Sequence, residues 1–300
     1  MELEQTCWQG MWIEHPPQWE LSRASGVDKP GRCTFSDRRY QRLDVQWRPL
    51  KYMPNMELML ARHRRNERKD DKSEVVDLLG APQEWVGIVR KTVEGPIIHA
   101  GRFFHEARLL TEVTLIWPGG RDGRLENAIL SSIRPAPPEG GVQRWRAMGI
   151  DMSVAGAYGL STSNTRVGRV KWEFRPAAKA AQVLSLERIA LPQQWLTMPL
   201  RDWLVEQLPS GQKAVRQDAC VFNNHRGEQL ISRGKISTVS SFRGLKRMML
   251  DVAWLCPTEG RVYHLRLIQP SRSEEISMPD HLRVACCRPA PVVKIQWTGQ

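Results

Sequence analysis

The 300 residues are enough for one large or two medium-sized domains, and 41% of them are hydrophobic, which is enough to bury a core. The formal charge of +12 is uneven: residues 1–142 carry 21 Lys and Arg against 20 Asp and Glu, whereas the rest of the chain carries 23 against 12. The first residues, Met1–Gln5, form no cationic or apolar leader, and no segment approaches the roughly 20 apolar residues of a membrane span. We therefore expect a cytoplasmic protein whose second half attracts an anionic partner.

Two strands and a helix are predicted early in the chain. Residues 32–36 and 42–47 flank the turn-forming Asp37. The second run alternates apolar with polar residues, which is typical of a half-buried antiparallel strand. A helix is then predicted from Asn55, a favourable N-cap residue, to Arg68.

A meander of strands and a second helix are predicted next. Residues 84–93 and 95–104 read as a hairpin, because Glu94-Gly95-Pro96 favours a turn between them. Residues 105–117 follow as an apolar strand. Residues 125–133 carry Leu and Ile at helical spacing, so we expect an amphipathic helix that lies across the sheet.

The second half of the sequence repeats the order of the first. Trp19–Trp47 and Trp145–Trp172 each open on Trp and reach Val-x-Trp shortly before Arg-Pro. A helix-like run follows in both, at 55–68 and at 177–191. We interpret this as two diverged copies in tandem, because a repeat about one domain long indicates duplication.

Downstream segments match in the same way. Val113–Pro118 resembles Tyr263–Pro270, and the helix-like 125–133 is matched by the shorter Met278–Val284. Extra residues in the second copy include Leu200–Leu208, which are predicted as an amphipathic helix. The predicted parts are residues 1–135 as the first domain, 136–142 as a linker, 143–288 as the second domain with an insertion near 199–217, and 289–300 as a C-terminal tail.

The expected fold class is α+β, with two tandem domains that each consist of an antiparallel β-sheet with packed helices. This order of elements, with Trp19, Pro118 and the helix at 125–133, resembles the PsbP-like superfamily. That superfamily includes the adaptor-chaperones of type VI secretion effectors. The resemblance covers much of the first copy and less of the second. It implies an α/β/α sandwich in each copy and a non-enzymatic role in binding another protein.

No catalytic or nucleotide-binding motif is present in the sequence. A G-x-S-x-G elbow, a Walker A loop and a G-x-G-x-x-G turn are all absent. Cys33 and Cys220 lie in apolar strands, where a thiol is usually inert. We therefore expect neither an enzyme nor a cofactor.

Cysteines near the C-terminus are candidate metal ligands. Cys286 and Cys287, with Cys256, Cys220 and either His264 or His281, contain the ligand types of a zinc site. Structural zinc sites usually contain C-x₂₋₄-C pairs, and adjacent cysteines on a strand point to opposite faces. The sequence therefore favours buried thiols and no metal.

Tryptophan and basic side chains are the candidate binding residues, since exposed Trp and Arg dominate protein interfaces. The tryptophans outside the repeated strands are Trp8, Trp12, Trp195, Trp203 and Trp297. The clustered cations are Arg62, Arg64, Arg65, Arg233, Lys235, Arg243, Lys246 and Arg247.

Together these observations predict a non-catalytic adaptor, chaperone or assembly subunit of a larger cytoplasmic complex, with its basic second domain facing an acidic partner. Nucleic-acid binding is the alternative, because Phe242 and Trp254 lie near the second cluster and aromatic rings among cations stack bases. Lys and Arg also protect strand edges from aggregation, without any ligand. The sequence leaves the oligomeric state open.

Overall fold

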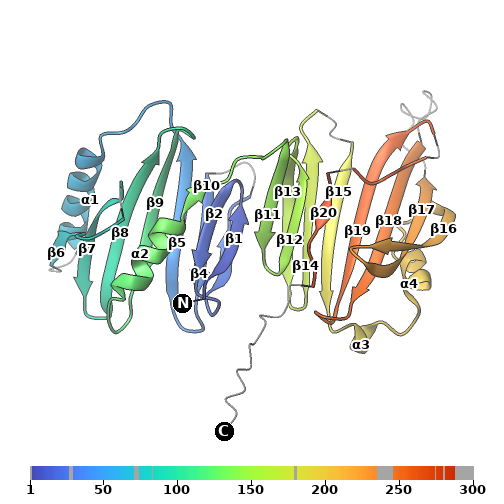
Figure 1. The fold of residues 1–300 in the computed structure, drawn as a ribbon, viewed down its shortest axis with the longest axis horizontal. Helices are drawn as coiled ribbons and strands as arrows, with labels where there is room; N and C mark the ends of the chain where they lie inside the picture. Colours follow the sequence, from blue (N-terminus) through green and yellow to red (C-terminus); the bar gives the residue numbers. More distant parts are fainter. Residues whose placement is uncertain are drawn as a thin grey trace, which may run out of the picture. The chain divides into compact units, whose positions relative to one another are not determined.

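The structure is a computed structural model in which the chain divides into two compact units (Figure 1). The described residues are 2–26, 30–70, 74–82, 84–178, 181–234, 246–273, 275–279 and 281–287. Unit 1 begins at the N-terminus, and the division falls within strands β12 (Ile150–Ala155) and β13 (Tyr158–Arg166). It therefore lies downstream of the predicted linker 136–142.

Unit 1 contains a seven-stranded antiparallel sheet of order β3-β4-β5-β9-β8-β7-β6. Its strands are β3 (Glu20–Ala24), β4 (Gly31–Ser36), β5 (Gln41–Pro49), β6 (Val75–Asp77), β7 (Val86–Thr92), β8 (Gly95–Phe104) and β9 (Leu109–Ile116). A smaller group of strands in this unit has the order β10-β2-β1-β11. These are β1 (Glu4–Trp8), β2 (Met11–His15), β10 (Arg134–Pro135) and β11 (Val142–Ala147).

Two helices of unit 1 confirm the local sequence signals. Helix α1 (Met56–Asp70) begins after Asn55, whose Oδ1 accepts a hydrogen bond from the backbone N–H of Leu58 at 2.9 Å. Helix α2 (Gly123–Ser132) is capped by Asp122 in the same way and packs on β2. In both cases the cap satisfies a backbone N–H that has no partner inside the helix.

Unit 2 contains a second seven-stranded antiparallel sheet, of order β13-β14-β15-β19-β18-β17-β16. Its further strands are β14 (Arg169–Pro176), β15 (Val183–Ala190), β16 (Gln212–Phe222), β17 (His225–Gly234), β18 (Lys246–Cys256) and β19 (Arg261–Ser271). Helices α3 (Pro192–Trp195) and α4 (Leu200–Glu206) follow β15, and β20 (Arg283–Val284) pairs with β12. Both seven-stranded sheets place their strands in the same order along the chain, and the duplication itself stays a prediction.

The predicted α+β class is wrong, because the fold is largely antiparallel β. Among the residues that the structure describes, there are 20 strands and only four helices. The expected helix at 177–191 is strand β15, in which Leu184 and Leu186 lie on one face and Ser185 and Glu187 on the other. This alternation has the period of a strand, and pairing with β14 and β19 on both sides decides the structure.

Two further expectations about the repeat are corrected by the strand order. Trp47 lies in β5, the third strand of its sheet, whereas Trp172 lies in β14, the second strand of its own. The two Trp segments are therefore displaced by one strand. The predicted insertion near 199–217 contains α4, which stands between β15 and β16 as α1 stands between β5 and β6. Its predicted helix is confirmed, but no described residue of 278–284 is helical.

The two faces of the unit 2 sheet differ in polarity. Residues directly opposite each other on neighbouring strands share a face. The row Trp172, Leu186, Leu265 and Val252 is at most 4% exposed and belongs to the core. The next row lies on the other face and contains Glu187 and His264, and α4 packs over β17 and β18. Among the residues that the structure describes, no helix is both long and apolar enough to cross a membrane.

Candidate interaction surface

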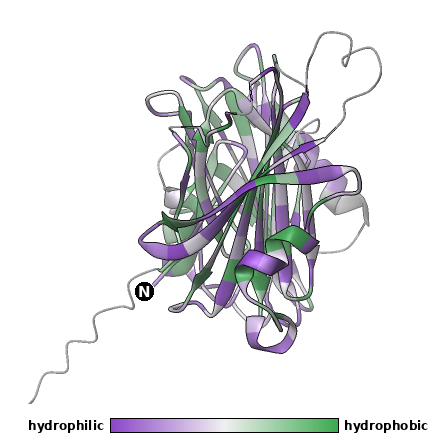
Figure 2. Ribbon diagram, turned by 90° about the vertical axis from the view of Figure 1, so that its right-hand side faces the viewer, coloured by the Kyte–Doolittle hydropathy of each residue, from purple (hydrophilic) through white to green (hydrophobic). Residues whose placement is uncertain are grey.

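Strand β16 forms the edge of the unit 2 sheet and is a candidate site for binding another chain. It has 11 residues and pairs with β17 on one side, and the described residues place no strand on its other side. Most of its side chains are exposed, including Val215 and Val221. Figure 2 faces this side of the molecule, where hydrophilic and hydrophobic segments follow one another along the edge hairpin. The free N–H and C=O groups of such an edge can hydrogen-bond an added extended segment.

Cations surround this edge. Lys213 lies directly opposite Arg233 of β17, and Arg216 forms an ion pair with Asp218 at 2.6 Å. The pairing register shifts between Ala214 and Arg216, which is a β-bulge. A bulge and cations on an edge discourage pairing with another strand in general. An acidic strand reduces the repulsion between the paired cations and is therefore the favoured neighbour.

A shallow hollow of about 620 Å³ lies beside the same edge. Its lining residues come from the far end of the β16–β17 hairpin and the start of α4: Leu200, Ala219, Cys220, Val221, Arg226, Gly227 and Glu228. Val221 is 73% exposed here, and Arg226 is exposed beside it. The hollow therefore combines apolar surface with a cation next to the open edge.

Helix α4 packs beside this hairpin and is anchored by two side chains. Trp203 and Leu204 are buried, in a cluster that includes Leu230 of β17 and Ala253 of β18. The indole of Trp203 meets the ring of His264 edge-on at 5.3 Å between centroids. This packing fixes the helix on the polar face of the sheet.

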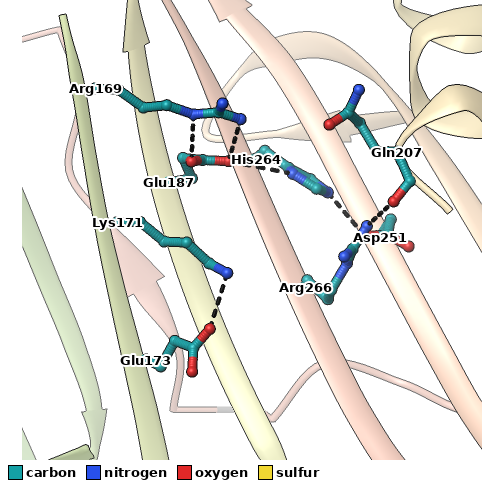
Figure 3. A network of polar contacts seen from close by, with 8 residues as sticks. All are labelled: Arg169, Lys171, Glu173, Glu187, Gln207, Asp251, His264 and Arg266. Carbon is teal, nitrogen blue, oxygen red and sulfur yellow. Dashed lines mark hydrogen bonds and ion pairs between the residues drawn. The ribbon is translucent and has the colours of Figure 1, made fainter. Parts of the chain in front are cut away.

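A network of ion pairs crosses the same face (Figure 3). Asp251 is fully buried and accepts hydrogen bonds from His264 Nε2 at 2.7 Å and Arg266 Nε at 2.6 Å. Arg266 also donates to the backbone oxygen of Gln207, the C-cap residue of α4, at 2.8 Å. A cation at this position favours the helix C-terminus, so the network links the sheet to the end of α4.

Glu187 completes the network on the other side of His264. Arg169 binds its carboxylate through Nε at 2.5 Å and through a second nitrogen at 3.0 Å. Burial raises the pKa of Glu187, but hydrogen bonds from His264 and Arg169 outweigh it, so the pKa is lowered overall. Glu187 is thus held ionised by fixed cations, which suits a structural role better than proton transfer.

In unit 1 the two candidate tryptophans contact their own domain. Trp8 is 1% exposed and meets Trp145 edge-on. Trp12 is partly buried, with the guanidinium groups of Arg134 and Arg144 at 5.2 and 5.5 Å from its ring. These contacts leave Trp8 almost no surface for a partner.

The tryptophans of unit 2 also pack internally. The indole N–H of Trp195 donates to the backbone oxygen of Ala190 at 2.8 Å, and its ring packs on Trp203. Trp203 is 6% exposed. Trp297 lies outside the described residues.

The candidate cations separate into two groups, one in each unit. Arg62, Arg64 and Arg65 lie on α1, where Arg64 forms an ion pair with Asp77. Arg233 lies on β17 and Lys246 and Arg247 on β18, whereas Lys235 and Arg243 lie outside the described residues. The sequence therefore identified part of the charge beside β16 but missed Lys213, Arg216 and Arg226, because the edge position of their hairpin is set by the tertiary structure.

Of the two aromatic residues proposed for base stacking, only Trp254 is among the described residues, and its ring is not exposed. Trp254 is fully buried and stacks on Tyr263, with ring centroids 5.2 Å apart. Phe242 lies outside the described residues. Base stacking requires an accessible face, so Trp254 does not support the nucleic-acid alternative.

A cavity of about 250 Å³ lies in unit 1 between α1 and the sheet. Met56, Met59 and His63 of the helix line it, together with His99 and Thr114 of the sheet. Burial, and then the charges of His63 and Arg90, lowers the pKa of His99 to about 4. No described side chain of α1 is buried, so this helix covers the sheet loosely.

Three cysteines and one histidine meet at one end of unit 2. Cys256 Sγ lies 3.1 Å from Cys287 Sγ, which lies 2.9 Å from His225 Nε2. With Cys286 Sγ, all four atoms lie within 4.8 Å of one another. The sequence pointed to the three cysteines but considered Cys220, His264 and His281 beside them and missed His225.

Comparisons with known proteins give distant similarities. No protein-family model matches the sequence, and no curated protein matches it, so the resemblance to the PsbP-like superfamily gains no support. Among solved structures, the chain is similar to the apo structure of immunity protein TplEi of T6SS from Pseudomonas aeruginosa, with a TM-score of 0.36, 12% identity and coverage of 95% of this chain and 97% of that chain. It is also similar to TplEi complexed with "L" peptide, with a TM-score of 0.33, 10% identity and coverage of 91% and 90%. The Tle4-Tli4 complex matches with a TM-score of 0.33, 13% identity and coverage of 91% and 89%.

Proposed function

We propose that this chain is a non-catalytic, cytoplasmic protein-binding subunit, and that an extended acidic segment of its partner adds to β16. The observation that carries the proposal is the edge itself: an 11-residue strand with exposed side chains and no described strand beyond it. Backbone hydrogen bonds along such an edge supply affinity, and side-chain contacts supply specificity.

The acidic character of the partner is inferred from charge. Residues 143–300 carry 23 Lys and Arg against 12 Asp and Glu. Lys213 and Arg226 lie exposed at opposite ends of the edge hairpin. An acidic segment that runs along β16 meets both cations, and its apolar side chains meet Val221 and the hollow beside it.

The non-catalytic role is supported by the polar network of unit 2. Asp251 and Glu187 are each held by an arginine, and the network reaches the end of α4. These contacts give the two buried carboxylates a structural role, because the network that contains them holds α4 against the sheet. The absence of sequence motifs for nucleophilic or phosphate chemistry agrees with this assignment.

The proposal is tested by charge reversal on the edge hairpin. The variant Lys213→Glu/Arg226→Glu and the wild type are used to capture proteins from native lysate treated with nuclease. A matched control, Arg62→Glu/Arg65→Glu, makes the same change in net charge on exposed residues of α1. We expect a set of proteins captured by the wild type and the control but lost from the hairpin variant.

Three results would overturn the proposal. Equal capture by both variants would exclude the β16 edge. Loss of all captured proteins on nuclease treatment, with nucleic acid recovered in its absence, would favour the nucleic-acid alternative. A mass that doubles with concentration in the wild type and not in the hairpin variant would show that a second copy of this chain occupies the edge.

A further inference from the structure

The cluster of three thiols and one imidazole in unit 2 is built by three separate segments. His225 opens β17 directly after the hairpin turn at Asn223 and Asn224, Cys256 closes β18, and Cys286 and Cys287 follow β20. All of these residues belong to the same unit. None of them lies in β16 or lines the hollow beside it.

We propose that His225, Cys256, Cys286 and Cys287 bind one Zn²⁺ ion. Three cysteines and one histidine form one of the usual ligand sets of structural zinc sites, and both atom types are preferred by this metal. The four ligand atoms already lie within 4.8 Å of one another.

The distances fit a tetrahedral site after a small adjustment. Zinc–sulfur bonds of about 2.3 Å place two sulfur ligands about 3.8 Å apart, and a sulfur and a nitrogen ligand slightly closer. The Cys256–Cys287 sulfur distance is 3.1 Å, and the Cys287–His225 distance is 2.9 Å. Each pair therefore separates by less than about 1 Å to admit the ion, which rotation of the side chains allows.

The backbone explains how adjacent cysteines serve the same ion. Neighbouring side chains of an extended segment point to opposite faces, which was the sequence argument against a metal. Cys287 instead has a φ of 59°, in the left-handed region, so the chain turns at this residue. The turn brings both sulfurs to the side where His225 and Cys256 lie.

A second layer of contacts positions the ligand-bearing segment. The side-chain amide of Asn223 donates to the backbone oxygen of Val284, and it lies 3.9 Å from Cys286 Sγ. The backbone N–H of Ala285 donates to the backbone oxygen of Asp151 at 2.7 Å. Contacts of this kind orient metal ligands in known sites.

A disulfide is the competing use of the same thiols. Bonded sulfurs lie about 2.05 Å apart, whereas Cys256 and Cys287 lie 3.1 Å apart and all six cysteines are free. A disulfide also leaves His225 and one cysteine without a role. Four protein ligands fill the coordination of zinc, so the proposed role is structural: the ion fastens residues 283–287 to the ends of β17 and β18.

The test is the metal content of the full chain, purified under reducing conditions and measured by elemental mass spectrometry. We expect one Zn²⁺ per chain in the wild type and less than a fifth of that in Cys286→Ser and His225→Gln. Cys220→Ser is the matched control, because Cys220 is a partly buried thiol on the neighbouring strand, outside the cluster. We expect this control to retain the ion.

Cobalt binding by the wild type keeps the proposal testable even if the ligand variants fold poorly. Metal-free wild type titrated with Co²⁺ should show thiolate charge-transfer and tetrahedral d–d absorption bands, which are reversed by Zn²⁺. Removal of the metal should also speed hydrogen exchange in the backbone of residues 283–287, but leave exchange in β4 and β5 of unit 1 unchanged.

The proposal would be overturned if the wild type contained no zinc and gave no thiolate–cobalt bands on titration. Full zinc content in Cys286→Ser or His225→Gln would also overturn it. A mass two hydrogens short of the reduced chain, with a mapped Cys256–Cys287 linkage after purification under reducing conditions, would assign these thiols to a disulfide instead.

Discussion

Helices α1 and α4 occupy the same place in the order of elements of their units but pack very differently. Helix α1 has 15 residues and an N-cap, yet no described side chain of it is buried and a cavity of about 250 Å³ lies beneath it. Helix α4 has seven residues, buries Trp203 and Leu204, and has its C-cap carbonyl bound by Arg266. A strong local helix signal is therefore a poor guide to how firmly a helix is held, because tertiary packing supplies most helical stability in proteins.

The largest effect should come from removing the anchor of α4. Trp203→Ala should destabilise unit 2 by about 4 kcal/mol, since it removes a buried indole from a packed cluster. Met59→Ala in α1 should cost about 1 kcal/mol in unit 1, because Met59 is only partly buried beside the cavity. Native-state hydrogen exchange measures both effects in the unit concerned. Equal losses of stability in the two variants would show that α1 and α4 are held equally firmly in their units.

A slightly smaller effect should follow from breaking the network beneath α4. Asp251→Ala leaves the buried His264 and the partly buried Arg266 without their shared carboxylate, which should cost about 3 kcal/mol in the free energy of unfolding. Asp218→Ala is the matched control, since its pair with Arg216 is exposed and should contribute less than about 1 kcal/mol. Denaturant unfolding measures both values. A loss in Asp251→Ala no larger than in the control would show that the network does not hold the helix.

The smallest effect is a pH dependence of the stability of unit 1, whose sheet is loosely covered by α1. The pKa of His99 is lowered from its ordinary value of 6.5 to about 4, first by burial. As the pH falls from 6.5 to 4, the unfolded chain takes up this proton before the folded one, so unit 1 loses stability in that window. His99→Gln should flatten this part of the pH profile, and the exposed His105→Gln should leave it unchanged. Identical slopes for wild type and His99→Gln, measured by hydrogen exchange, would contradict the prediction.

Local features were predictable where a short segment contains its own reason to fold. Asn55 and Asp122 mark the starts of α1 and α2, and a turn at Val93 and Glu94 joins β7 to β8. Each of these depends on a few neighbouring residues, either a cap or a turn. The amphipathic α4 was also predicted, although the burial of Trp203 was not: the sequence placed that side chain among the candidates for a partner surface.

Features that depend on distant segments were missed. Strand β15 was expected to be a helix, and only its neighbours β14 and β19 decide otherwise. The matched Trp segments lie in strands of different position in the two sheets, because matching Trp and Arg-Pro positions carry less information about the fold than the order of strands. His225 was not associated with the cysteines, although it follows the Asn223-Asn224 turn and so begins a strand.

The sequence by itself determined the caps and turns, the uneven charge and the types of residue available for binding. These properties depend on composition and on neighbours along the chain. Only the tertiary structure decided that β16 lies at an edge, that Trp203 is buried, and that Cys287 lies beside His225, 62 positions away. Strand pairing brings such residues together through long-range contacts, and these depend on the whole sheet and not on any single segment.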